Sequence, residues 1–257
     1  MSAALPRRRL GVRGPEVSLL GLGTVKFGRR TGLRHPRPFA CPDDAAAARL
    51  LDRARALGVN LIDTAPAYGE SEARLGRILR GRREDFVLVT KTGEIFDGAR
   101  SRFDFSAAHT RRSVHDSLRR LGTDRLDCVL LHSDGDDAVL LEDDGALGAL
   151  EALKRSGEIL HVGISTKTVA GGRAALDRVD VLMLTLDPDD PVERELARAA
   201  AAEGCGVLIK KALDSGHAQD PARALRRVAA CAGVASIVVG TIDPAHLAAN
   251  AAALTGS

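Results

Sequence analysis

Three ionisable residues end three successive apolar stretches of the sequence. Asp63 closes the stretch NLID, Lys91 closes VLVTK, and His132 closes CVLLH. Charged side chains are seldom buried without a partner, so core packing alone would not place one at the end of each stretch. Tyr68 follows shortly after Asp63 and is the only tyrosine in the chain. A carboxylate, a phenol, an ammonium and an imidazole together can move a proton to or from a carbonyl oxygen.

Each of these residues also has a simpler interpretation. Asp63 could cap a helix or a turn, and His132 could be a hydrogen-bonded histidine of the core. Lys91 could bury only its aliphatic chain and hold its ammonium group in solvent, and Tyr68 could simply pack in the core. Their joint position at the ends of neighbouring strands favours catalysis, because active residues of β/α barrels come from the carboxyl ends of several strands.

The rest of the chain alternates between short apolar stretches and longer stretches of helical period, which is typical of parallel strands joined by helices. The predicted strands are residues 19–25, 59–63, 86–91, 126–132, 160–165, 181–186, 206–210 and 236–240. The predicted helices are residues 43–57, 72–80, 107–121, 145–156, 169–176, 192–202, 221–230 and 244–254.

Eight such units predict an α/β fold, a single (β/α)8 TIM barrel over residues 1–257, with a short β-hairpin in residues 6–18 at the barrel bottom. An open, doubly wound nucleotide-binding sheet should carry G-x-G-x-x-G after a strand, and Gly21-Leu22-Gly23 lacks the third glycine. Residues 29–42, with three prolines, read as a loop over the barrel mouth.

Composition excludes several other classes. The 37 basic and 34 acidic residues nearly balance, which argues against a nucleic-acid partner, and Arg7, Arg8 and Arg9 read as a solvated segment rather than a polyanion site. The four cysteines lie far apart, so we predict no metal site. No stretch resembles a signal peptide or approaches the roughly 20 apolar residues of a membrane span, so we expect a cytoplasmic protein without membrane contact.

The motifs around the four residues resemble the aldo-keto reductase superfamily, and the resemblance covers nearly the whole chain. The matching segments are NLIDTAxxYG (60–69), VTK (89–91), LLH (130–132), VSLLGLGT (17–24), GIS (163–165) and GTxxPxxLxxN (240–250). The sequence ends shortly after the last predicted helix, so it resembles short bacterial-type members that lack the long C-terminal tail over the substrate pocket.

This resemblance implies a nicotinamide cofactor bound across the barrel mouth without a Rossmann domain. The positions that it assigns to the cofactor are Gly23, Thr24, Asp63, Ser165, Thr166, Met183, Lys210, Lys211, Leu213, Asp214, Gly240, Thr241, His246 and Asn250. Three positions depart from the family pattern. Thr166 stands where relatives have Asn, Met183 stands near a usual Gln, and the last unit has no Lys or Arg for a 2'-phosphate. We expect NADPH, with NADH as the alternative.

The resemblance also implies carbonyl reduction and a role for each of the four residues. The reaction needs a hydride at carbon, a proton at the developing alkoxide and a dry pocket that stabilises the negative oxygen. We predict that Tyr68 is the acid and that Lys91 favours its phenolate, because a phenol with a pKa of about 10 is too weak alone. Asp63 would pair with Lys91, and His132 would hydrogen-bond and orient the substrate oxygen.

The resemblance therefore implies an NAD(P)-dependent aldo-keto reductase (EC 1.1.1.-) that interconverts a small aldehyde or ketone and its alcohol, as a monomer or weak homo-oligomer. Two alternatives stay open. One is an NAD-dependent aldose dehydrogenase. The other is a cofactor-sensing regulatory subunit on the same barrel, as in potassium-channel beta subunits.

Overall fold

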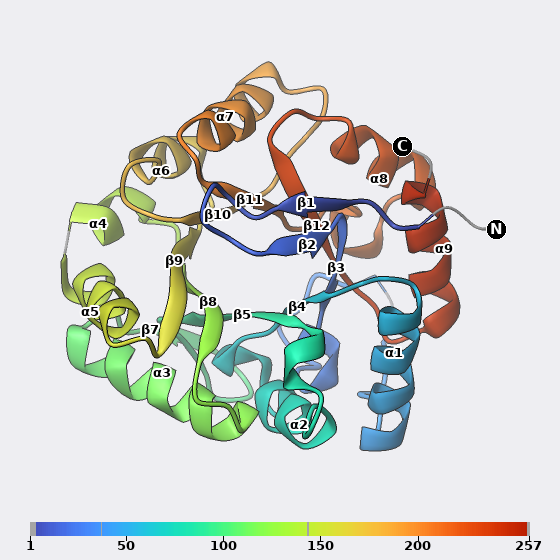
Figure 1. Cartoon of the computed structure of the whole chain (residues 1–257), viewed down its shortest axis with the longest axis horizontal. Helices are drawn as coiled ribbons and strands as arrows, with labels where there is room; N and C mark the ends of the chain where they lie inside the picture. The colour runs from blue at the N-terminus through green and yellow to red at the C-terminus, as the bar shows by residue number, and fades with distance from the viewer. Residues whose placement is uncertain (1–3, 37, 143, 256–257) are drawn as a thin grey trace.

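A closed barrel of eight parallel strands forms the centre of the molecule (Figure 1). The computed structural model describes residues 4–36, 38–142 and 144–255. In chain order the barrel strands are β3 (Leu20–Gly23), β4 (Leu61–Asp63), β5 (Val87–Thr92), β8 (Leu126–His132), β9 (Ile159–Ser165), β10 (Val181–Leu184), β11 (Gly206–Ile209) and β12 (Val234–Gly240). Strand β12 pairs with β3 and closes the ring. The predicted barrel and its eight strands are confirmed.

Helices surround the barrel (Figure 1). They are α1 (Asp44–Ala56), α2 (Ser71–Ile78), α3 (Ala107–Leu121), α4 (Asp137–Glu142), α5 (Asp144–Arg155), α6 (Val169–Ala174), α7 (Pro191–Ala202), α8 (Pro221–Ala229) and α9 (Pro244–Leu254). All eight predicted helices are present, whereas the short helix α4 was not predicted. Within the described ranges, no helix is long and apolar enough to cross a membrane.

Helix ends follow from local chemistry. The carboxylates of Asp43, Asp190 and Asp243 accept hydrogen bonds from backbone N–H groups in the first turns of α1, α7 and α9, as expected of N-cap residues. Helix α3 ends at Gly122, whose φ of 65° lies in the left-handed region that glycine adopts without steric cost. These signals set where each helix returns the chain to the barrel.

Strand register explains why the ionisable residues face inward. Alternate residues of a strand point to the same side, and Leu61, Val89 and Leu130 belong to the apolar cluster inside the barrel. The next residues on that side are Asp63, Lys91 and His132, and each ends or nearly ends its strand. The three side chains therefore lie directly above the apolar filling, at the carboxyl end of the barrel.

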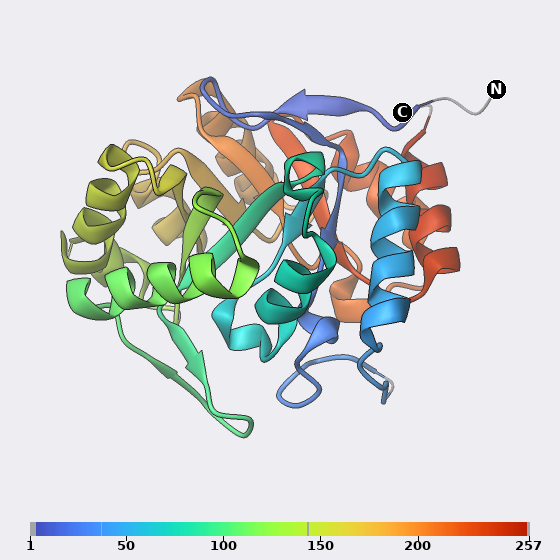
Figure 2. The same cartoon turned by 60° about the horizontal axis from the view of Figure 1, so that its bottom comes forward.

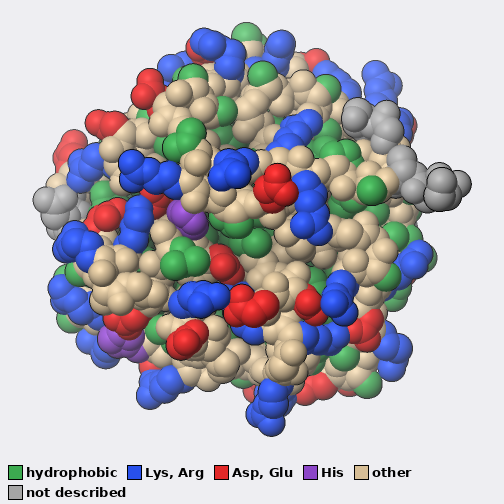
Figure 3. Space-filling model, viewed as in Figure 1, with side chains coloured by type: hydrophobic (Ala, Val, Ile, Leu, Met, Phe, Trp, Pro, Cys, Tyr) green, Lys and Arg blue, Asp and Glu red, His purple; other side chains and the backbone are tan. Residues whose placement is uncertain are grey.

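The opposite end of the barrel is closed by the predicted hairpin, formed by β1 (Arg7–Arg9) and β2 (Glu16–Ser18) (Figure 2). Leu10 and Val17 are buried in the same interior cluster as the barrel side chains. Arg8 donates hydrogen bonds to the carbonyl oxygens of Val234 and Ala229, and thereby ties the hairpin to the barrel. On the face seen in Figure 3, basic and acidic side chains intermingle rather than forming a patch of one sign.

Shortening a buried side chain of the β1–β2 hairpin tests this packing. Leu10 is 1% exposed, so Leu10→Ala is expected to lower the free energy of unfolding by about 2 to 5 kcal/mol, the range for a buried leucine that leaves a cavity. Val12 lies in the same hairpin and is 69% exposed. Val12→Ala should therefore change the free energy of unfolding by no more than about 0.5 kcal/mol. Urea unfolding measures both. Equal effects would show that Leu10 does not contribute to the core.

Candidate active site

A large cavity opens at the carboxyl ends of the barrel strands and has a volume of about 1340 Å³. The loop of residues 29–36 and the loop that follows β11 both border it. His217 Nε2 lies 3.1 Å from the carbonyl oxygen of Arg34, so the two loops touch each other. Residues 29–36 of the predicted segment 29–42 thus form a loop at the barrel mouth, as predicted, and residue 37 lies outside the described residues.

Asp63 and Lys91 form a buried ion pair at the base of the cavity. Their exposed fractions are 4% and 2%, and Lys91 Nζ contacts Asp63 Oδ1 directly. The same ammonium donates to the carbonyl oxygen of Thr64 at 2.8 Å. Burial lowers the pKa of Lys91, but Asp63 and Tyr68 more than offset this effect, and the net pKa is raised. Lys91 therefore stays cationic at neutral pH.

Tyr68 ends a 3-10 turn (Pro66–Tyr68) that follows β4. The turn brings the phenol over the ion pair, and Lys91 Nζ lies 4.9 Å from the centre of the Tyr68 ring. Burial raises the pKa of Tyr68 to about 12, although the Lys91 charge and hydrogen bond lower it. The phenol is therefore protonated at neutral pH. Sequence reasoning considered the effect of Lys91 but not the larger effect of burial.

His132 completes the group. Its ring lies edge-on to Tyr68, with ring centres 6.3 Å apart and planes at 84°. Burial lowers the pKa of His132, and contact with Glu94 only partly opposes this effect, so the imidazole is neutral at pH 7. The structure thus brings the four predicted side chains together at one end of one cavity.

Sequence reasoning missed two residues of this site, Glu94 and Arg29. Glu94 begins a hairpin, β6 (Glu94–Phe96) and β7 (Ser101–Phe103), which was not predicted. Its carboxylate lies 2.9 Å from His132 Nδ1 and accepts a 2.9 Å hydrogen bond from Arg29. The available signal was an acidic residue three positions after the strand-end Lys91, in the stretch KTGE.

Most residues assigned to the cofactor line the same cavity. They are Gly23, Asp63, Ser165, Thr166, Met183, Lys210, Lys211, Leu213, Gly240, Thr241, His246 and Asn250. Thr24 and Asp214 are not among the lining residues. Thr24 is fully buried, and its hydroxyl donates to the carbonyl oxygen of Asp63 at 2.9 Å. It therefore contacts the backbone of a site residue without lining the cavity.

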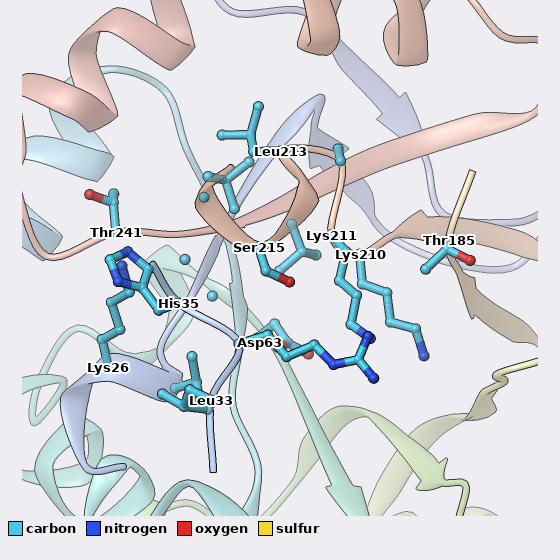
Figure 4. A pocket seen from close by; sticks show the side chains of 18 of the residues that line it. Lys26, Leu33, His35, Asp63, Thr185, Lys210, Lys211, Leu213, Ser215 and Thr241 are labelled. Atoms are coloured by element: carbon cyan, nitrogen blue, oxygen red, sulfur yellow. The ribbon is translucent and has the colours of Figure 1, made fainter. Parts of the chain in front are cut away.

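The cavity lining is strongly basic. Figure 4 shows Lys210 and Lys211 on one side and Lys26, His35 and Thr241 on the other. Lys210 Nζ donates to Ser165 Oγ and to the carbonyl oxygen of Thr166, each at 2.7 Å, and neither acceptor is a carboxylate. Within the described ranges, neither Lys26 nor Lys211 forms an ion pair with a carboxylate. Such cations suit a ligand that carries negative charge.

The basic cavity fits a phosphate-bearing cofactor in size as well as in charge. Ordinary small-ligand pockets have volumes of roughly 300 to 1,000 Å³, and the volume of this cavity, about 1340 Å³, exceeds that range. Lys211 and Ser215, in the loop after β11, have φ angles of 59° and 57°. Non-glycine residues in this strained region often mark ligand sites, which agrees with a binding role for that loop.

Comparisons with known proteins agree with this geometry. The model of the aldo/keto reductase family matches residues 19–223. A crystal structure of a "putative aldo-keto reductase" from Pseudomonas aeruginosa is 50% identical, with a TM-score of 0.89 over 98% of this chain and 96% of that chain. The holo form of an aldo-keto reductase from Bacillus halodurans is 27% identical, with a TM-score of 0.83 over 98% and 92%.

Curated relatives include dehydrogenases that are named for sugars. L-galactose dehydrogenase of Arabidopsis thaliana is 34% identical over 81% of this chain and 66% of its own length. D-threo-aldose 1-dehydrogenase of a Pseudomonas species is 28% identical over 79% and 68%. An uncharacterised oxidoreductase of Bacillus subtilis matches over 48% of its length, so the chain spans about half to two thirds of these relatives. Together with the family match and the barrel, these findings show that the chain belongs to the aldo/keto reductase family.

Proposed function

We propose that this protein is an NAD(P)-dependent oxidoreductase that interconverts a small aldehyde or ketone and its alcohol. The observation that carries the proposal is the convergence of Asp63, Tyr68, Lys91 and His132 at one end of a cavity large enough for a cofactor and a substrate. Membership of the aldo/keto reductase family supports it.

The four side chains have separable roles. A bound reduced nicotinamide would supply the hydride. Tyr68 holds a proton on its phenol oxygen and donates it to the carbonyl oxygen as negative charge develops there. The Lys91 ammonium stabilises the resulting phenolate, since a cation beside the phenol favours its charged form. Asp63 fixes Lys91, and His132 orients the substrate. In the oxidative direction Tyr68 takes the proton back.

We propose NADPH as the preferred cofactor because of the charge of the cavity. The charged side chains that line it are Lys26, Arg29, Arg34, Lys91, Lys167, Lys210 and Lys211 against Asp63, Glu94 and Asp220. Two of the three carboxylates, Asp63 and Glu94, are already paired with cations. The excess of positive charge favours the nucleotide that carries the additional phosphate, by the same electrostatic attraction that favours phosphate binding generally.

Titration of the purified protein with NADPH and NADH, followed by a panel of small carbonyls with the tighter nucleotide, tests this proposal. We expect saturable binding of NADPH, weaker binding of NADH, and turnover of at least one aldehyde. Binding of neither nucleotide would refute the proposal. Tight binding without turnover of any carbonyl would instead favour a cofactor-sensing protein.

The pH dependence of nucleotide binding gives a second test. Burial, followed by the charges of Lys211 and Lys91, lowers the pKa of Lys210 to about 7. An anionic phosphate favours the protonated amine, so affinity should be highest below pH 7. Between pH 7 and pH 9 it should fall by up to about fiftyfold, because the protonated fraction of the amine drops from about one half to about one hundredth. Lys210→Met should bind more weakly at pH 6 and lose most of this dependence. A wild-type dissociation constant that is equal at pH 6 and pH 9 would contradict the assignment.

A second candidate function is oxidation of an aldose with NAD. The similarity to L-galactose dehydrogenase and D-threo-aldose 1-dehydrogenase favours it, and both functions use the same four residues. Rates with sugars and each oxidised nucleotide, compared with rates for simple aldehydes and each reduced nucleotide, separate the two.

A further inference from the structure

One ring nitrogen of His132 faces protein rather than the cavity. His132 Nδ1 is fully buried and has no aligned hydrogen bond with any described residue. Its polar neighbour is Glu94, whose Oε2 lies 2.9 Å away. The N–H direction is not aligned on this oxygen, so the two atoms are in close contact without forming a hydrogen bond of good geometry. The opposite edge of the ring, which carries Nε2, is left for the cavity that His132 lines.

Glu94 is itself held in place. Its Oε1 accepts hydrogen bonds from Arg29 at 2.9 Å and from Ser101 Oγ at 2.5 Å, which leaves Oε2 for His132. Arg29 is 8% exposed and also donates to the carbonyl oxygens of Thr31 and Ala67. Ala67 precedes Tyr68, so the arginine joins the mouth loop, the phenol-bearing turn and the hairpin. Glu94 therefore has a fixed position as well as a fixed charge.

The carboxylate is ionised at neutral pH and forms an ion pair with Arg29. Burial alone would raise the pKa of Glu94, but its contacts with His132, Ser101 and Arg29 outweigh burial and hold the pKa well below its usual range. An ionised carboxylate accepts hydrogen bonds and donates none. It can therefore face Nδ1 only when Nδ1 carries a proton.

A neutral imidazole carries one proton, on one nitrogen or the other. The groups that act on His132 are Glu94 on β6, Lys91 on β5 and Lys210 directly after β11, and the two amino groups oppose a second proton on the ring. Tyr68 packs on the ring as a neutral phenol. The proton attracted to Glu94 is thus the single proton of the ring, and Nε2 keeps its lone pair.

We propose that Glu94 is a positioning residue that holds the proton of His132 on Nδ1, so that Nε2 accepts a hydrogen bond from a hydroxyl group of the substrate. A simple aldehyde has no such hydroxyl. A hydroxyaldehyde or a sugar has one beside the reacting carbon. In this proposal Tyr68 alone donates to the carbonyl oxygen, and the hydrogen bond of His132 goes to the neighbouring hydroxyl instead of to the reacting oxygen as first predicted. The assignment of substrate class rests on the proposed function, whereas the position of the proton does not.

Long-range 1H–15N correlation spectra of uniformly 15N-labelled protein distinguish the two ring tautomers of His132, and a His132→Gln spectrum assigns its signals. At pH 7 we expect a protonated Nδ1 and an unprotonated Nε2 in the wild type. In Glu94→Gln the amide can donate to Nδ1, so the exclusive Nδ1–H form should be lost. Ser101→Ala is the matched control. It removes a hydrogen bond to the same carboxylate but not its charge, and should keep the wild-type tautomer.

A wild-type spectrum with the proton on Nε2 would overturn the proposal, and this result needs no variant to fold. An unchanged tautomer in folded Glu94→Gln would also overturn it. The spectra require no turnover, so they test the position of the proton even if the proposed oxidoreductase function is wrong.

Substrate discrimination gives the functional readout. Sites built to hydrogen-bond a hydroxyl strongly reject analogues that lack it. We expect wild-type kcat/KM to be at least about tenfold higher for lactaldehyde than for propanal, and we expect the ratio to fall to about threefold or less in Glu94→Gln while Ser101→Ala keeps it. A purely structural role of Glu94 would lower both rates equally. Equal ratios in the wild type and Glu94→Gln would contradict the substrate assignment.

Discussion

Tyr68→Phe is expected to lower carbonyl reduction at least about a hundredfold, the lower end of the range for a positioned general acid. The change removes one oxygen atom from a side chain whose ring packs against His132 and Lys91, so the cavity and its basic lining should stay intact. Nucleotide affinity should therefore change little. Steady-state rates and a nucleotide titration on the same preparation measure the two effects.

The chain holds no second tyrosine that could replace the phenol. Turnover of Tyr68→Phe within a few-fold of the wild type would thus remove Tyr68 from the mechanism. Loss of nucleotide binding together with turnover would instead indicate a structural role. Because the pKa of Tyr68 is raised to about 12, wild-type reduction should not decline through loss of this proton between pH 6 and pH 9.

Lys91→Met is expected to abolish activity and to destabilise the protein. Removal of the ammonium leaves the Asp63 carboxylate buried without its cation, and such a broken buried pair typically costs about 3 to 5 kcal/mol. The Thr64 carbonyl also loses its donor. Urea unfolding and steady-state rates measure the effects, and an unchanged rate with an unchanged pH profile would contradict the role of Lys91.

The double variant Asp63→Asn with Lys91→Met separates stability from catalysis. It removes both charges, so the free energy of unfolding should recover most of what the single variant loses. Activity should not recover, because the phenolate of Tyr68 still lacks a cation. Recovery of turnover in the double variant would show that Lys91 acts only through folding.

The barrel and the four side chains were predictable because each depends on a local signal. Eight apolar stretches separated by helical stretches predict the strands, and the ionisable residues end their strands in the same register as inward-facing Leu61, Val89 and Leu130. The signals for helix ends, such as Asp43 and Gly122, lie within a few residues of the ends themselves.

The missed features depend on contacts between distant segments. Arg29 and Glu94 are 65 positions apart in the sequence, and no periodicity links them. The hairpin that carries Glu94 has strands of three residues each, too short for an alternating pattern. The position of Thr24 behind the site and the raised pKa of Tyr68 both follow from burial, which depends on how the loops pack over the strand ends.

The most direct test of the account is hydride transfer itself. Wild-type protein would be incubated with lactaldehyde and NADPH or NADH that carries deuterium at the transferable position, and the product alcohol analysed by mass spectrometry. We predict one deuterium on the former carbonyl carbon with the wild type and at least about a hundredfold slower formation with Tyr68→Phe. Product without deuterium, or equal formation by the two proteins, would contradict the proposed active site.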